Sequence, residues 1–163
     1  VQHAPPYYHR SMSKAFTLEA AKPKFGGVLS LEFADGAAFD VDLNETIRRY
    51  PSLIALEDPK VFKRAKVGEW GGSVSWGTDD LEMSADNLRS LAVEQSGGYS
   101  HERIVEWMHQ HQLTQQQAAD ALGLSRRMLG YYLSGEKPIP KTVALAVIGW
   151  EHVKGDERFA HAV

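Results

Sequence analysis

The sequence changes its hydrophobic periodicity near residue 96, and this change limits the folds available to the chain. Upstream, apolar and polar residues alternate in short runs, which is the pattern of half-buried β-strands. Downstream of residue 100, apolar residues recur three and four positions apart, as they do in amphipathic helices. The intervening Ser-Gly-Gly-Tyr-Ser favours a turn or short linker. We therefore expect an α+β domain at residues 1–95, a linker at 96–100 and an all-α domain at 101–163.

The N-terminal segment predicts an antiparallel sheet. Residues 28–33 and 38–43 alternate in polarity around Asp35-Gly36, which favours a β-hairpin. Residues 65–70 and 73–76 are a second hairpin candidate, and we expect Trp70 and Trp76 to be core residues rather than a ligand-stacking pair. Further elements are predicted in four places: a strand at Met12–Ala20, and short helices at 44–50, 58–63 and 84–94, the second of them capped by Asp58. An acidic group predicts a polar turn rather than a cation site: Asp79, Asp80, Glu82 and Asp86.

Four helices are expected after the linker. In the first, Ile104, Trp107 and Met108 share one face, and Ser100 is the predicted N-cap. The other three are predicted at Gln115–Leu122 with Thr114 as N-cap, from the Ser125 cap to Ser134, and at Lys141–Val153. The last helix carries a second apolar stripe of Leu145 and Ile148, which we expect the N-terminal domain or a second subunit to cover.

Residues 114–135 combine a short helix, a tight turn and a second capped helix, which is the layout of a helix-turn-helix. The small Ala119 lets the two helices approach closely, and Gly123 suits the turn. Leu129 and Tyr132 are expected to anchor the second helix inward. The opposite face and the segment beyond it carry Arg126, Arg127, Gly130, Tyr131, Ser134, Lys137 and Lys141. Because an Arg side chain can bind a guanine edge through two N–H groups, this face suits a DNA major groove.

The segment from Ile104 to Trp150 resembles the lambda-repressor-like, Xre-type DNA-binding domains of bacteria and phages, above all in Leu113-Thr114-Gln115 and in the residues after Ser125. In that family the Gln of this opening usually lies near a phosphate, and the residues after the second cap usually face bases or backbone. The resemblance and the local run of cations together predict a site for double-stranded DNA made of Thr114, Gln115, Ser125, Arg126, Arg127, Tyr131, Ser134, Lys137 and Lys141. Three residues depart from the family pattern and predict a differently packed or thinner core: Met108 for a frequent Arg, Gln112 for a frequent Gly, and Ala118 for a usual Leu.

The N-terminal segment resembles a small bacterial domain family of unknown function. The likeness lies in Pro5-Pro6-Tyr7-Tyr8-His9-Arg10, Phe33-Ala34-Asp35-Gly36, Val41-Asp42-Leu43, Leu56-Glu57-Asp58-Pro59 with Phe62, and Trp76. Members of that family occur alone, fused to such helix-turn-helix domains, or encoded near toxin-antitoxin genes. The resemblance implies an architecture and no chemistry.

Charge confines any nucleic-acid site to a small area. The 163 residues carry 18 Lys and Arg against 21 Asp and Glu, a net charge of -3, so the chain is no general polycation. Residues 1–100 hold 11 cations and 14 anions, whereas residues 101–163 hold seven of each. Because one helical module offers few cationic contacts, useful affinity favours a homodimer on a near-palindromic DNA site.

Composition also narrows the chemistry and the location. The absence of cysteine excludes disulfides, Cys-type zinc sites and thiol nucleophiles. His101-Glu102 is followed by Val105 where a zinc-protease helix needs His, so no metal or cofactor is expected. No apolar run approaches the roughly 20 residues that cross a bilayer, and no signal-peptide core is visible, so we expect a cytoplasmic protein.

These features together predict a sequence-specific DNA-binding protein, namely a bacterial transcriptional regulator. The alternative is an antitoxin-like protein-interaction module, whose N-terminal sheet binds a protein and whose helices bind DNA for autoregulation. No sequence motif supports an enzyme.

Overall fold

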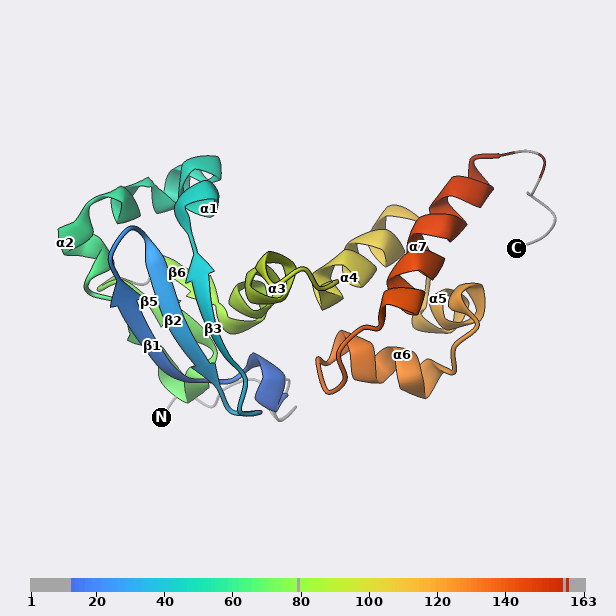
Figure 1. Ribbon diagram of the computed structural model, residues 1–163, viewed down its shortest axis with the longest axis horizontal. Helices are drawn as coiled ribbons and strands as arrows, with labels where there is room; N and C mark the ends of the chain where they lie inside the picture. Colours follow the sequence, from blue (N-terminus) through green and yellow to red (C-terminus); the bar gives the residue numbers. More distant parts are fainter. Residues whose placement is uncertain (1–12, 79, 157, 159–163) are drawn as a thin grey trace, which may run out of the picture. The chain divides into compact units, whose positions relative to one another are not determined.

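The computed structural model describes residues 13–78, 80–156 and 158 (Figure 1). The chain is α+β, with antiparallel sheets in its N-terminal part and helices in its C-terminal part, as predicted. It divides into two compact units, and the division falls between Asp86 and Asn87. The linker predicted at residues 96–100 therefore lies within the second unit. No helix of the described part is long and apolar enough to cross a membrane.

Three antiparallel strands form the first sheet in the order β1 (Leu18–Lys24), β2 (Val28–Phe33) and β3 (Ala38–Asp42). The predicted hairpin at residues 28–43 is confirmed: Leu29 pairs with Val41, and Gly36 turns the chain with a φ of 88°. The inward side chains of β2 are fully buried, because alternate residues of a strand point to opposite faces.

The strand predicted at residues 12–20 is wrong over most of its length. Residue 12 lies outside the described part of the chain. Lys14–Phe16 forms a 3-10 turn, η2, because the Ser13 hydroxyl accepts a hydrogen bond from the Ala15 amide. The strand begins only at Leu18 and continues to Lys24, which pairs with Val28 across a turn of two glycines with positive φ.

A helical segment follows the first sheet. It consists of α1 (Asn44–Arg49), the 3-10 helix η3 (Pro51–Glu57) and α2 (Pro59–Phe62). Asp58 caps α2, as predicted, because its carboxylate accepts a hydrogen bond from the Lys60 amide at 2.9 Å. Four apolar side chains of this segment are buried: Ile47, Leu53, Leu56 and Phe62.

A second antiparallel sheet has the order β4 (Lys66–Val67), β5 (Ser73–Ser75) and β6 (Glu82–Ser84). The pairing of β4 with β5 confirms the second predicted hairpin, but β6 was expected to be a polar turn. Glu82 of this strand is exposed, whereas Met83 is buried and pairs with Val74. Of the four acidic residues, Glu82 therefore lies in the strand, Asp80 precedes it and Asp86 follows it, while Asp79 lies outside the described residues.

Trp70 contradicts its predicted core position. It lies in the 3-10 turn η4 (Glu69–Gly71) with a φ of 59°, and its side chain is 87% exposed, whereas Trp76 is buried as expected. The next residue, Gly71, packs against the backbone of Leu18 so closely that a Cβ there would clash. This close approach fixes the turn and directs the Trp70 side chain outward.

The helices of the C-terminal part are α3 (Ala85–Gln95), α4 (His101–Gln110), α5 (Gln115–Leu122), α6 (Arg126–Leu133) and α7 (Lys141–Lys154). The bounds of α3, α5, α6 and α7 agree with the predicted ones to within about one residue, and α4 begins directly after its predicted N-cap position. Ile104, Trp107, Leu129, Tyr132 and Val147 belong to one buried core. The rings of Trp107 and Trp150 meet edge to face at 5.2 Å, which joins α4 to α7.

Ser100 occupies the N-cap position of α4 but does not cap it with its side chain. The Ser100 hydroxyl is buried and donates to the Glu94 carboxylate instead. The predicted capping bond, in which the hydroxyl oxygen would accept from a backbone N–H of α4, is not formed, and the side chain is bonded to Glu94 of α3.

Candidate nucleic-acid interface

The geometry of α5 and α6 is fixed by their ends. Thr114 and Gln117 form a capping box, in which the Thr114 hydroxyl accepts from the Gln117 amide at 3.2 Å and the Gln117 side chain accepts from the Thr114 amide at 2.9 Å. Gly123 ends α5 in the left-handed region, with a φ of 67°. Ser125 then caps α6 by accepting from the Met128 amide at 3.1 Å. The three predicted turn and cap residues are thereby confirmed.

Small side chains on α5 bring α6 close. Ala118 and Ala119 are completely buried, and Leu129 of α6 is completely buried against the same core. Tyr132 is buried as well, whereas the adjacent Tyr131 is half-buried. Because Leu129 and Tyr132 lie three residues apart on one face, the remaining face of α6 is left outside the core.

The predicted DNA-binding residues all lie at the surface. Thr114, Gln115, Ser125, Arg126, Arg127, Lys137 and Lys141 are exposed, and Tyr131 and Ser134 are half-buried. The structure brings together four members of this set: Arg127, Tyr131, Ser134 and Lys137. The hydroxyls of Thr114 and Ser125 are occupied as helix caps, which leaves them a structural role as well.

Tyr131 organises the basic face of α6. The Arg127 Nε donates a hydrogen bond to the Tyr131 hydroxyl at 2.7 Å. The Lys137 ammonium lies 5.0 Å from the centre of the Tyr131 ring, within the range of a cation–π contact. The Lys137 amide and the Ser134 hydroxyl both donate to the Tyr131 carbonyl, each at 3.3 Å. One tyrosine thus holds two cations and the turn that follows α6.

The bond through Nε has a chemical consequence for Arg127. A guanidinium has five N–H donors, and a bond made by Nε leaves the four donors of its terminal NH2 groups free. That planar fork is the part of an arginine that binds a guanine edge or a phosphate through two hydrogen bonds. The spacing of four residues between Arg127 and Tyr131 is the sequence signal from which this contact could have been inferred.

The turn before α5 contains Gln112, the residue that stands where lambda-repressor-like domains often have Gly. Gln112 has a φ of 52°, and the Leu113 amide bonds back to the Met108 carbonyl at 2.8 Å, which is the geometry of a glycine-ended helix. Glutamine therefore occupies a position that favours Gly.

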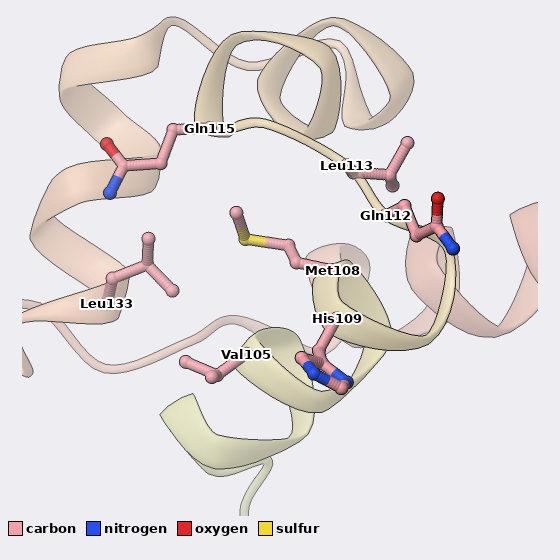
Figure 2. Close-up of a pocket in the computed structure, with 7 residues that line it drawn as sticks. All are labelled: Val105, Met108, His109, Gln112, Leu113, Gln115 and Leu133. Atoms are coloured by element: carbon pink, nitrogen blue, oxygen red, sulfur yellow. The ribbon is translucent and has the colours of Figure 1, made fainter.

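Beside this turn lies a groove of about 570 Å³ between α4, α5 and α6. Figure 2 shows Met108 in its middle and Gln115 at its rim; the other lining residues are Val105, His109, Gln112, Leu113 and Leu133.

Two comparisons relate the chain to known proteins. Residues 20–94 match the family described as Protein of unknown function (DUF2442), which confirms the expected likeness to a domain family of unknown function. A crystal structure of a protein from Nitrosomonas europaea, described as a putative DNA binding protein, is similar with a TM-score of 0.77 and 39% sequence identity. The similarity covers 86% of this chain and 89% of that one. The chain belongs to the family of this protein. No curated protein matches the sequence significantly.

The extent of the structural similarity matters for the candidate interface. A match over 86% of the chain is longer than either compact unit, so it includes residues of both. The DUF2442 match, by contrast, ends at residue 94, before α4 begins. The family of unknown function therefore describes the sheet-bearing part, and the basic face of α6 lies beyond it.

Proposed function

We propose that the chain is a sequence-specific DNA-binding protein and a bacterial transcriptional regulator. In this proposal α5, its turn and α6 form a lambda-repressor-like helix-turn-helix, and α6 is the recognition helix. The observation that carries the proposal is the outward face of α6, where Arg126 and Arg127 are exposed in the first helical turn. The helix dipole is positive at the N-terminus of α6 and disfavours two cations there, so an external anion would stabilise them. The description of the Nitrosomonas europaea relative as a putative DNA binding protein supports the same class of ligand.

The residues divide into two roles. Arg126, Arg127 and Tyr131 face the base edges of the major groove, with the Arg127 fork oriented by the hydroxyl of Tyr131. Four residues position the helix on phosphates: Gln115, Ser134, Lys137 and Lys141. Lys137 and Lys141 are exposed and follow the C-terminal end of α6, so they extend the basic surface away from the helix.

A homodimer completes the proposal. Leu145 and Ile148 on α7 are 55% and 54% exposed, so the helical unit by itself leaves uncovered the apolar stripe that the sequence predicts to be covered. A second copy bound through this stripe would bury it and double the number of phosphate contacts. Two recognition helices would then read half-sites about one DNA turn apart, roughly 34 Å.

Binding to a pool of genomic DNA fragments at two salt concentrations tests the function. The wild type is expected to enrich a common sequence, and the Arg126→Ala/Arg127→Ala variant is expected to lose about 1 to 3 kcal/mol of discrimination per base-reading Arg. The matched control is Lys22→Ala/Lys24→Ala, which removes the same charge from exposed positions of β1. Equal selectivity of the two variants, or no enrichment by the wild type, refutes the proposal.

A further inference from the structure

A second basic surface lies on the unit that is otherwise acidic. Residues 48–66 contain six cations and two anions, although residues 1–100 as a whole have more anions than cations. All six cationic side chains are exposed: Arg48, Arg49, Lys60, Lys63, Arg64 and Lys66. We call this set the α1–α2 surface. It is more strongly basic than residues 126–141, which hold four cations and one anion.

The local fold separates these cations from the core. Four apolar residues of α1, η3 and α2 are buried, namely Ile47, Leu53, Leu56 and Phe62, and η3 packs against both helices. Lys60, Lys63 and Arg64 are spaced by three and four residues, so they share one side of α2 and the turn after it. Figure 1 shows α1 and α2 joined along one edge of their unit. The strip that we refer to below is therefore this single stretch of chain, residues 48–66, with its six exposed cations.

The cations of this strip lack acidic partners within the described part of the chain. None of the six side chains forms an ion pair or hydrogen bond with another described residue. Elsewhere on the same unit a lysine is paired: Lys24 lies 2.7 Å from Asp40, and its hydrogen bond lowers the pKa of that carboxyl. Helix dipoles favour cations at Arg48 and Arg49 in the last turn of α1 and at Lys60 in the last turn of α2, but not at Lys66, which lies on β4.

From this charge distribution we infer that the α1–α2 surface binds the phosphate backbone of DNA, in addition to the contacts made by α6. The inference rests on the proposed function, which supplies the DNA. A phosphate backbone offers a row of anions without fixed side-chain geometry, so it suits several unpaired Lys and Arg residues along a strip. Tyr50 and Ile54, each about half exposed, lie between the two groups of cations and offer apolar contact to the sugars. The strip would attract DNA electrostatically, although the net charge of the whole chain is negative.

The salt dependence of DNA binding by the full-length protein tests the inference. The test variant is Arg48→Gln/Arg49→Gln/Lys60→Gln/Lys63→Gln, and the matched control is Lys22→Gln/Lys24→Gln/Arg103→Gln/Lys154→Gln, with folding of both checked by thermal unfolding. Each phosphate contact that is lost lowers the slope of log K against log salt by about 0.9. We expect a slope lowered by two or more in the test variant, with the ratio of specific to random binding unchanged, and a smaller effect in the control.

The outcomes separate this inference from the proposed function. A wild type that selects a sequence, together with an unchanged slope in the test variant, overturns the inference and leaves the proposed function standing. A wild type that binds DNA without selectivity, with a slope that the test variant lowers, refutes the proposed function and supports the phosphate contact. Loss of binding to vesicles containing phosphatidylserine, without any change in DNA binding, assigns the surface to membranes and overturns the inference. No DNA binding by the wild type overturns both.

Discussion

The two basic surfaces of the molecule differ in how their side chains are held. On α6, Arg127 donates to the Tyr131 hydroxyl at 2.7 Å, and Lys137 lies over the same ring. On the α1–α2 surface, six exposed cations contact no other described side chain through a hydrogen bond or ion pair. A base edge has fixed donors and acceptors, so reading it favours an ordered side chain, whereas a phosphate accepts a cation from many directions. Under the proposed function, the held side chains of α6 are suited to specificity and the unpaired cations of the α1–α2 surface to added affinity.

The largest effect is expected from removing the support beneath α6. Leu129→Ala leaves a cavity in the core of the helical unit and should lower the free energy of unfolding by about 2 to 5 kcal/mol. Ile54→Ala on the α1–α2 surface is the control, because its half-exposed side chain should cost little. Urea denaturation followed by circular dichroism measures both. Similar losses in the two variants would show that α6 is no better anchored than the other surface.

Substituting lysine for arginine distinguishes a hydrogen-bonded contact with a base edge from a contact that depends on charge alone. Arg127→Lys keeps the cation but removes the planar fork, so selectivity for the target sequence should fall by about 1 to 3 kcal/mol while the salt slope stays the same. Arg49→Lys on the α1–α2 surface should change neither quantity. Competition binding with target and random duplexes measures the selectivity. A salt slope reduced by Arg127→Lys would instead assign Arg127 to a phosphate.

The hydroxyl of Tyr131 is expected to have a smaller effect of the same kind. Tyr131→Phe keeps the ring beside Lys137 and removes the acceptor of the Arg127 hydrogen bond, so selectivity should fall by about 0.5 to 1.5 kcal/mol. Tyr50→Phe is the matched control, since the Tyr50 hydroxyl bonds to no described residue. The same competition assay applies. If Tyr131→Phe binds target and random DNA as the wild type does, the Arg127 side chain is oriented by the DNA alone.

How much of this could be predicted from the sequence depends on the range of the forces involved. The ends of α5 and α6 are local: Thr114, Gly123 and Ser125 act on amides and carbonyls within a few residues, and all three were predicted correctly. Trp70 was not, because its exposure follows from the packing of the neighbouring Gly71 against Leu18, some 50 positions earlier in the chain. Sequence patterns report neighbours along the chain better than neighbours in space.

The candidate interface shows the same division. Periodicity places Tyr132 in the core and Tyr131 outside, and the structure agrees. The basic strip at residues 48–66 cannot be recognised from the net charge of the whole N-terminal part, because that sum hides a local excess of cations. Gln112 could not be predicted to adopt a positive φ, since its own preference is for a right-handed conformation and the turn to Leu113 overrides it.

A last and smaller effect concerns the backbone of α6. Gly130 lies inside this helix. Apart from its two chain neighbours and the backbone of α6, a Cβ added there would meet no described atom within 4 Å. Gly130→Ala should therefore raise the free energy of unfolding by about 0.5 to 1 kcal/mol, because alanine loses less backbone entropy in a helix. If α6 enters the major groove closely, the same methyl group should weaken binding to the target. Unfolding and DNA binding are measured on one preparation of the variant. A more stable variant with unchanged affinity would mean that Gly130 does not serve the approach of α6 to DNA. The difference between α6 and the α1–α2 surface would then lie only in how their side chains are held.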